Sequence, residues 1–242
     1  MGRTPWCESI DQAIPVVGDL YNLDYEMLIR LNPTHILVQP PATGIDEALT
    51  TLAHEQGWVI GQWRLDDIDD IETLVQELPG VLSGDDRSML GALSSKAASL
   101  TNELAMAVSP MGKKIFDGRT LLVVDFDPVM SFGPGSYLHD MLVSLGGHNA
   151  LESGSYKSLS LEDVIRLNPE AIVFVKPYKS DPSETPDPLE LLGPLRETNL
   201  EAVVTGRIAV LSHPDALLPS TGLIEVASSL RDILVSFATG DP

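Results

Sequence analysis

Ile29-Arg30-Leu31-Asn32-Pro33 is repeated residue for residue as Ile165-Arg166-Leu167-Asn168-Pro169. The flanking sequence repeats as well, so that segment 23–38 aligns without a gap on segment 159–174. In both copies we expect a short helix that ends at Asn-Pro and is followed by an apolar strand, because proline cannot continue a helix and disfavours the α conformation of the preceding residue. One widely spaced doubling, unlike the short tandem repeats of a solenoid, predicts two similar lobes. A cleft between two lobes is a common place for a small ligand.

Outward from the two copies, apolar strands alternate with helical patterns, which is typical of α/β folds with parallel sheets. In the N-terminal half we expect strands at 16–18, 35–39 and 58–65 and helices at 23–31, 45–55 and 68–78, the last ended by Pro79-Gly80. In the C-terminal half we expect strands at 120–125, 171–176 and 207–211, helices at 136–145, 161–167 and 220–237, and loops at 126–135 and 177–188.

Residues 85–108 are expected to form one long helix, because this segment lacks proline and its apolar residues recur at spacings of three and four. Such a helix would span about 36 Å and could run along both lobes. The predicted organisation is therefore an N-terminal lobe at 1–84, a connecting helix at 85–112 and a C-terminal lobe at 113–242.

The composition is that of a globular protein, with 43% hydrophobic residues and a mean hydropathy of +0.09. A net charge of −20 argues against binding to nucleic acid or to an anionic membrane surface. Cys7 is the single cysteine, so no internal disulfide is expected. The first residues have neither a basic nor an apolar leader segment, and we expect no signal peptide in this chain.

No residue pattern predicts catalysis, a metal site or a bound cofactor. His-Glu-x-x-His, Cys-x-x-Cys and Gly-x-Ser-x-Gly patterns are absent, and no two histidines are three or four residues apart. Gly133-Pro134-Gly135 lacks the third glycine of a dinucleotide-binding loop, and a structured turn is the simpler interpretation. The acidic run Asp66-Asp67-Ile68-Asp69-Asp70 lacks the glycine and distal glutamate of a calcium loop, and we expect it to cap the following helix.

Candidate ligand contacts lie in loops and segments that follow predicted strands in both halves, where open α/β sheets bind ligands. Each such residue alone is more often a packing residue, but their shared placement favours binding. The candidates are Trp6, Tyr21, Pro40, Met130, Phe132, Tyr137, Tyr178, His213 and Leu217.

Glu26 and Glu162 form a separate pair, each in the first turn of its repeat helix. A carboxylate there is favoured by the helix dipole, which is a sufficient structural explanation. The functional alternative is that two symmetric carboxylates present matching charges to a two-fold partner.

The chain resembles the class III, helical-backbone substrate-binding proteins of ABC importers, which deliver cobalamin, ferric siderophores or haem. The resemblance rests on the paired units at 26–38 and 162–174, the long helix at 85–108, and the segments 132–138 and 146–149. It implies an α/β fold of two Rossmann-like lobes with parallel-type sheets, joined by one long backbone helix. It also implies that the N-terminal lobe lacks the first strand and helix usual in that family.

By this resemblance Glu26 and Glu162 would dock on arginines of the membrane permease, and the ligand would bind between the lobes. We expect a monomer located in the periplasm or cell envelope, although this chain as written has no leader. Few basic residues are near the expected cleft, the candidates being Arg3, Lys176 and Lys179. That favours a corrinoid over a strongly anionic siderophore, with haem or a ferric chelate left open. Only His213 or a tyrosine could act as an axial metal ligand.

Two other interpretations remain at this point. The chain could be a cytosolic enzyme on a doubled Rossmann-like scaffold, because a fold does not determine a function. It could also be a truncated relative that binds nothing. Clustered carboxylates or histidines in the cleft would favour the enzyme, whereas a shallow aromatic cleft with Glu26 and Glu162 on the rim would favour the carrier.

Overall fold

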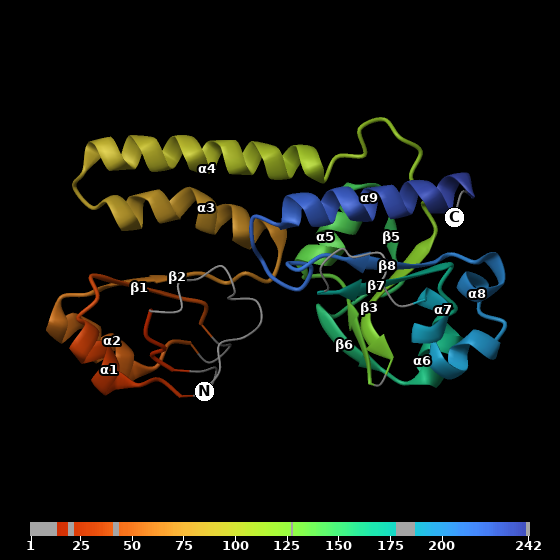
Figure 1. The fold of residues 1–242 in the computed structure, drawn as a ribbon, viewed down its shortest axis with the longest axis horizontal. Helices are drawn as coiled ribbons and strands as arrows, with labels where there is room; N and C mark the ends of the chain where they lie inside the picture. Colours follow the sequence, from red (N-terminus) through yellow and green to blue (C-terminus); the bar gives the residue numbers. More distant parts are fainter. Residues whose placement is uncertain (1–13, 19–21, 41–43, 127, 178–186, 241–242) are drawn as a thin grey trace. The chain divides into compact units, whose positions relative to one another are not determined.

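A computed structural model describes residues 14–18, 22–40, 44–126, 128–177 and 187–240, and Figure 1 shows the course of the chain. The described residues form two compact units. Unit 1 comprises Met1–Leu65 and Thr73–Ala97, and unit 2 comprises Asp66–Glu72 and Ala98–Pro242. Helices α3 (Ile68–Ser83) and α4 (Arg87–Ala107) therefore contribute residues to both units.

Unit 1 is built on a small parallel sheet of two strands, β1 (His35–Val38) and β2 (Val59–Gln62), in which His35 lies beside Val59. Helices α1 (Tyr25–Leu31) and α2 (Glu47–Gln56) pack against this sheet. The buried core of this packing consists of Leu28, Leu49, Ala53 and Trp58. The expected strand at 58–65 is thus shorter than predicted, and residues 16–18 form only an isolated bridge, between Gly18 and Leu23.

Unit 2 is built on a sheet that is mostly parallel, as we expected, and that also contains antiparallel strand pairs. Its strands are β3 (Arg119–Phe126), β4 (Val129–Phe132), β5 (His148–Asn149), β6 (Tyr156–Leu159), β7 (Ala171–Lys176) and β8 (Ile208–Ser212). The order is β6-β4-β3-β7-β8, with β5 beside the start of β3. Strands β3, β7 and β8 are parallel, whereas β4 is antiparallel to both of its neighbours, β3 and β6.

The predicted loop at 126–135 is wrong in part, because residues 129–132 of it form strand β4. Strand β4 has only four residues between glycine- and proline-rich turns, too few to show a period in the sequence. It forms because it can pair with β3 on one side and β6 on the other, and the pairing with β3 has a register shift between Val123 and Asp125. Such a pairing depends on residues distant in the chain and is not visible locally.

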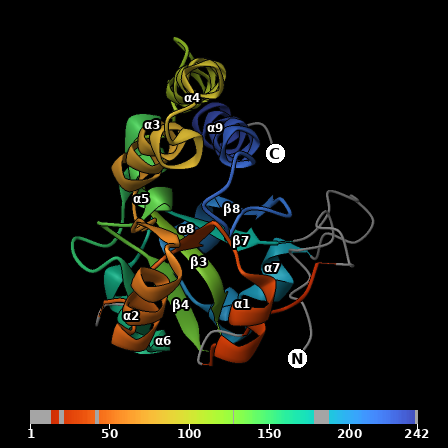
Figure 2. The same cartoon turned by 90° about the vertical axis from the view of Figure 1, so that its left-hand side faces the viewer.

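Helices cover both faces of the unit 2 sheet, and all six residues of the central strand β7 are buried. The covering helices are α5 (Tyr137–Ser144), α6 (Leu161–Leu167), α7 (Pro188–Leu191), the 3₁₀ helix η2 (Gly193–Glu197), α8 (Glu201–Thr205) and α9 (Leu223–Thr239). Helices α5 and α9 lie on one side of the sheet and α6 and α7 on the other (Figures 1 and 2). Because side chains alternate along a strand, Leu121 and Ile172 pack toward α6 and η2.

The repeated sequence adopts the same local structure in both units. Asp24 and Ser160 are the N-caps of α1 and α6, and each side chain accepts a hydrogen bond from the backbone three residues later. Each helix ends at an asparagine in the left-handed conformation, Asn32 at φ 46° and Asn168 at φ 43°. Asparagine tolerates this conformation better than most residues, and the following proline prevents continuation of the helix.

Two long helices differ in how well the sequence predicts them. Helix α4 (Arg87–Ala107) confirms the expectation of one helix at 85–108. Helix α3 continues through Pro79 to Ser83, so the expected end at Pro79-Gly80 is wrong. A proline removes one backbone donor, and the residues on either side of it remain helical here.

The C-terminal end of α4 is held by a buried arginine of α9. Arg231 is 8% exposed, and its guanidinium donates hydrogen bonds to the carbonyl oxygens of Ala107, at 3.1 Å, and Ser109, at 3.4 Å. The last carbonyls of a helix have no partner within the helix and have a partial negative charge. The arginine therefore both satisfies these carbonyls and has its own charge stabilised.

The left-handed cap gives a stability prediction. The Asn168 side chain also accepts a hydrogen bond from the backbone N–H of Glu201 at 3.0 Å. We expect Asn168→Ala to lower the free energy of unfolding by about 2 kcal/mol, through backbone strain and loss of that bond. Asn168→Gly keeps the left-handed conformation accessible and should cost only about 1 kcal/mol. Urea unfolding followed by circular dichroism measures both, and equal losses would contradict the role of the backbone conformation.

Candidate functional site

The two repeat glutamates are exposed on their helices and take no part in capping. In α6 the capping box is made by Ser160 and Asp163, and in α1 the cap is made by Asp24. Within the described residues, neither Glu26 nor Glu162 makes an ion pair or hydrogen bond. Both carboxylates are therefore available to a partner on equivalent helical turns.

An ion pair between a buried lysine and an exposed aspartate lies at the carboxyl ends of β3 and β7 in unit 2. The Lys176 ammonium is 3.2 Å from the Asp125 carboxylate, and the lysine side chain is 7% exposed. Burial of a charged group is tolerated when it is paired. Lys176, which we considered as a basic group for the ligand, is thus already neutralised by Asp125.

His213 follows β8 at the same edge of the sheet, and both of its ring nitrogens are engaged. Its Nδ1 accepts a hydrogen bond from the backbone N–H of Asp215 at 3.1 Å. The proton therefore lies on Nε2, which is 3.0 Å from a carboxylate oxygen of Glu225. His213 is held in one tautomer by its neighbours, and it is not free to ligate a metal without breaking one of these bonds.

Three aromatic residues gather near the junction of β4, β6 and α5. Phe132 is buried and meets Tyr156 edge to face, with ring centroids 5.5 Å apart. Tyr137 is 3% exposed, and its hydroxyl donates a hydrogen bond to the carbonyl oxygen of Ala216. Burial raises the pKa of both Tyr137 and Tyr156. Phe132 and Tyr137 are packing residues, whereas Tyr156 is 52% exposed and presents an aromatic surface.

Tyr156 was missed in the sequence analysis. It belongs to β6, a short strand whose existence depends on pairing with β4. The available signal was weak, a single aromatic residue after the turn-forming run Glu152-Ser153-Gly154-Ser155.

The remaining predicted contact residues are spread over separate elements. Met130 is 38% exposed on β4 and lies beside Asp125 of β3. Pro40 is half-buried just beyond β1, and Leu217 is half-buried in the turns after β8. Trp6, Tyr21 and Tyr178 lie outside the described residues, as do Arg3 and Lys179.

The acidic run at 66–70 caps α3, as we expected. The backbone N–H of Asp70 donates to Asp67, and that of Asp66 donates to the Asp70 carboxylate. The first turn of α3 is also bound to α5, because the Tyr137 N–H donates to the Asp66 carbonyl oxygen at 2.7 Å. Asp140 of α5 accepts from the Ile68 N–H at 3.2 Å. Burial raises the pKa of Asp140, against the opposing effect of this hydrogen bond.

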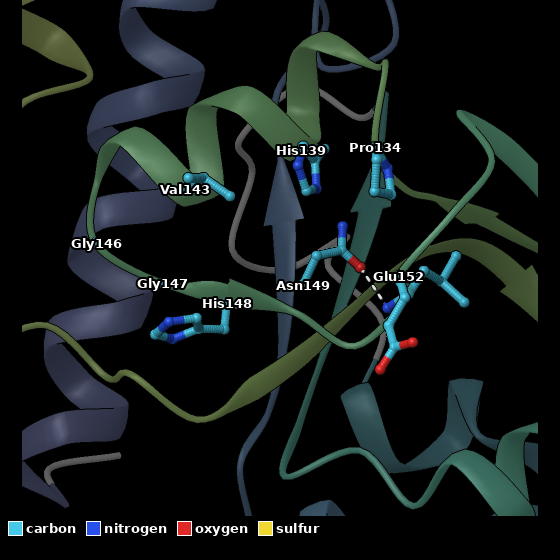
Figure 3. A pocket seen from close by; sticks show the side chains of 9 residues that line it. Pro134, His139, Val143, Gly146, Gly147, His148, Asn149 and Glu152 are labelled. Atoms are coloured by element: carbon cyan, nitrogen blue, oxygen red, sulfur yellow. Dashed lines mark hydrogen bonds between the residues drawn. The ribbon is translucent and has the colours of Figure 1, made fainter.

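A cavity of about 380 Å³ lies between α5 and β5. Figure 3 shows His139, Asn149 and Glu152 on its lining. The Asn149 carboxamide is used internally, because it donates to the Phe132 carbonyl oxygen and accepts from the Leu151 N–H. The His148 ring is likewise bonded to the Asp117 carbonyl oxygen. The Asn149 and His148 side chains of this cavity thus serve the local backbone.

The described residues were compared with the requirements of a metal site and of a membrane-spanning helix. In the part of the chain that the structure describes, no three His, Cys, Asp or Glu side chains are grouped to hold a metal ion. Of the described helices, none combines the length and the apolar character needed to cross a membrane.

The raised pKa of Asp140 gives a pH prediction. A carboxyl group with a folded-state pKa above its unfolded value of 3.8 binds its proton more tightly in the folded protein. Stability is therefore lost as pH rises from 3.8 through the folded-state pKa. We expect Asp140→Asn, which keeps an acceptor for Ile68, to be more stable than wild type at pH 7, with the gain shrinking toward pH 4. Urea midpoints across this range measure it, with exposed Asp117→Asn as the control; a pH-independent gain would contradict it.

The fold matches solved structures of periplasmic binding proteins, although no family model and no curated protein sequence matches the chain. A possible iron-binding, periplasmic solute-binding protein of Staphylococcus epidermidis aligns with a TM-score of 0.66 at 20% identity, over 88% of this chain and 80% of that one. The periplasmic vitamin B12 binding protein of Vibrio cholerae aligns with a TM-score of 0.63 at 15% identity, over 90% and 80% of the two chains. A periplasmic heme-binding protein of Roseiflexus aligns with a TM-score of 0.67 at 18% identity, over 93% and 84%. The sequence resemblance is thus confirmed in three dimensions: this chain has the α/β fold of the class III substrate-binding proteins of ABC importers.

Proposed function

We propose that this protein is the ligand-binding component of an ABC importer. It captures its ligand between the two lobes outside the cytoplasm and delivers it to the membrane permease. The supporting observation is the pair Glu26 and Glu162, two exposed carboxylates at equivalent positions of a doubled helix–strand unit that have no side-chain partner among the residues that the structure describes. The fold match is consistent with this role, and no catalysis is part of it.

The ligand that we propose is a corrinoid, with haem or a ferric chelate as the alternatives. Proteins of the same fold include a vitamin B12 binding protein, a heme-binding protein and a protein of an ABC-type Fe3+-hydroxamate transport system. A strongly anionic siderophore needs unpaired cations, and the one described candidate cation, Lys176, is paired with Asp125. An uncharged macrocycle is instead bound by apolar and aromatic surface.

The proposed contacts are the exposed and half-exposed members of the predicted set, with Tyr156 added to them. Met130, Pro40 and Leu217 retain accessible surface, and Tyr156 exposes half of its ring. Three further members of the predicted set are held by intramolecular contacts: Phe132, Tyr137 and His213. We propose that they support the contact residues rather than touch the ligand. Trp6, Tyr21 and Tyr178 complete the proposed set.

The proposal that the ligand is a corrinoid can be tested by tryptophan fluorescence. Trp58 is buried and Trp63 is half-buried, so the surrounding protein partly shields both from simple contact quenching. Cyanocobalamin and haem absorb where tryptophan emits, and a bound chromophore therefore quenches at a distance. We expect saturable quenching by cyanocobalamin with a Kd of about 1 μM or tighter, corresponding to about 8 kcal/mol of binding free energy.

The same titration is run with haem and with a ferric hydroxamate, each corrected for absorbance. Free tryptophan at equal concentration is the control for inner-filter and collisional effects. Saturation by haem or by the hydroxamate alone would replace the corrinoid, and no response from the folded protein would contradict the carrier function.

The glutamates give an independent prediction. The double variant Glu26→Gln, Glu162→Gln should bind ligand as wild type does but stimulate ATP hydrolysis by its permease about tenfold less, because charge pairing sets orientation and encounter rate. Stimulation is measured with the permease complex in lipid nanodiscs. The matched control is Glu55→Gln with Glu190→Gln, two exposed glutamates outside the repeat helices' first turns. Equal stimulation by both double variants would exclude docking through Glu26 and Glu162.

A further inference from the structure

Strand β7 ends with a charged residue at a buried position. The first five residues of the strand, at 171–175, are apolar and fully buried, and the sixth, Lys176, is buried as well. Burial of a charge is tolerated when the charge is paired, but a paired charge is no more stable there than a well-packed apolar residue. Packing therefore gives no preference for a lysine at the end of this strand.

The lysine is hidden behind an aspartate that faces solvent. The Lys176 ammonium lies 3.2 Å from one carboxylate oxygen of Asp125, and the aspartate side chain is 56% exposed, compared with 7% for the lysine. The other carboxylate oxygen accepts a hydrogen bond from the backbone N–H of Phe126 at 2.8 Å. Two bonds thus hold the carboxylate over the ammonium, and a molecule that approaches from solvent meets the carboxylate first.

Asp125 lies where the proposed function requires the ligand. Open α/β sheets bind ligands beyond the carboxyl ends of their strands, and Asp125 is next to the last residue of β3. Its neighbour in the register of β3 and β4 is Met130, one of the proposed contacts. At the end of β8, His213 accepts a hydrogen bond at Nδ1 and has its proton on Nε2, so the ring is uncharged. Neither Lys176 nor His213 therefore offers the ligand an unneutralised positive charge.

We propose that Asp125 is a specificity-determining residue of the ligand site. By covering Lys176, it makes this edge of unit 2 accept uncharged ligands and reject ligands that bring a carboxylate there. This inference rests on the proposed function and names the charge class of its ligand. An incoming carboxylate is repelled by the exposed oxygens of Asp125 and reaches the ammonium only by displacing them. An uncharged ligand meets neither obstacle.

Removal of either charge should change this selectivity, in opposite directions. Asp125→Asn keeps the size of the side chain and leaves the Lys176 charge unneutralised, which favours a ligand with a carboxylate. Lys176→Met places an apolar side chain at the buried position and leaves the Asp125 charge unneutralised, which disfavours such a ligand. A purely structural role of the pair would change the affinities for charged and uncharged ligands alike, and their ratio would stay constant.

The test compares ligands that differ only in carboxylate groups, by tryptophan fluorescence titration of the full chain. The pairs are cyanocobalamin with its monocarboxylic acid, haem dimethyl ester with haem, and N-acetyl ferrioxamine with N-succinyl ferrioxamine. For the pair that it recognises, the wild type should bind the uncharged member about tenfold more tightly. This ratio of Kd values should fall about tenfold in Asp125→Asn and rise about threefold or more in Lys176→Met.

Asp117→Asn is the matched control. Asp117 is exposed, has the same charge as Asp125 and precedes the opposite end of β3. At about 0.15 M salt the Debye length is about 8 Å, so the loss of this distant carboxylate should leave the ratio unchanged. Thermal melts verify that each variant is folded. If Asp125→Asn does not fold with an unpaired lysine, Lys176→Met still tests the inference through the opposite shift.

The outcomes separate this inference from the proposed function. A ratio that stays unchanged in the folded variants, with wild-type binding intact, overturns the role of Asp125 and leaves the carrier function in place. Tighter wild-type binding of the carboxylate member also overturns it, as does an equal shift in Asp117→Asn, which would reveal a general effect of net charge. Binding of no member of any pair by the folded wild type contradicts the proposed function and this inference with it.

Discussion

The attachment of α4 to unit 2 by Arg231 is the interaction on which the rest of this structure depends. Helix α4 begins among the residues of unit 1 and ends in unit 2, where the buried guanidinium binds the carbonyl oxygen of its last residue, Ala107. The first turn of α3 is bound to α5 in the same unit through Asp66 and Asp140.

The doubled unit uses the same residue for the same structural role in each copy. Asn32 and Asn168 are retained because each ends a helix in the left-handed conformation and bonds a neighbouring element, Trp58 in one copy and Glu201 in the other. Those roles are fully met inside each unit. The Glu26 and Glu162 side chains of the same helices are exposed and take no part in these roles.

In the candidate site, intramolecular partners decide whether a side chain remains available to a ligand. Lys176 and His213 were expected near a ligand, and the structure gives each a partner that is far away or unrecognisable in the sequence, Asp125 and Glu225. Tyr137 is similarly bonded to Ala216, and the two are far apart in the chain. Tyr156, which no pattern singled out, is the aromatic residue left exposed. Residue type alone did not predict which of these side chains would have intramolecular partners.

Local sequence determined the repeat, the long helix α4, the parallel strands β1, β3, β7 and β8, and the acidic cap of α3. Each of these follows from periodicity, proline or capping residues within about twenty positions. The strands β4 and β6, the continuation of α3 through Pro79, and the burial of Lys176 were decided only in three dimensions. Their energies come from pairing, packing and charge neutralisation between segments far apart in the chain, and such contacts leave no periodic trace in either segment alone.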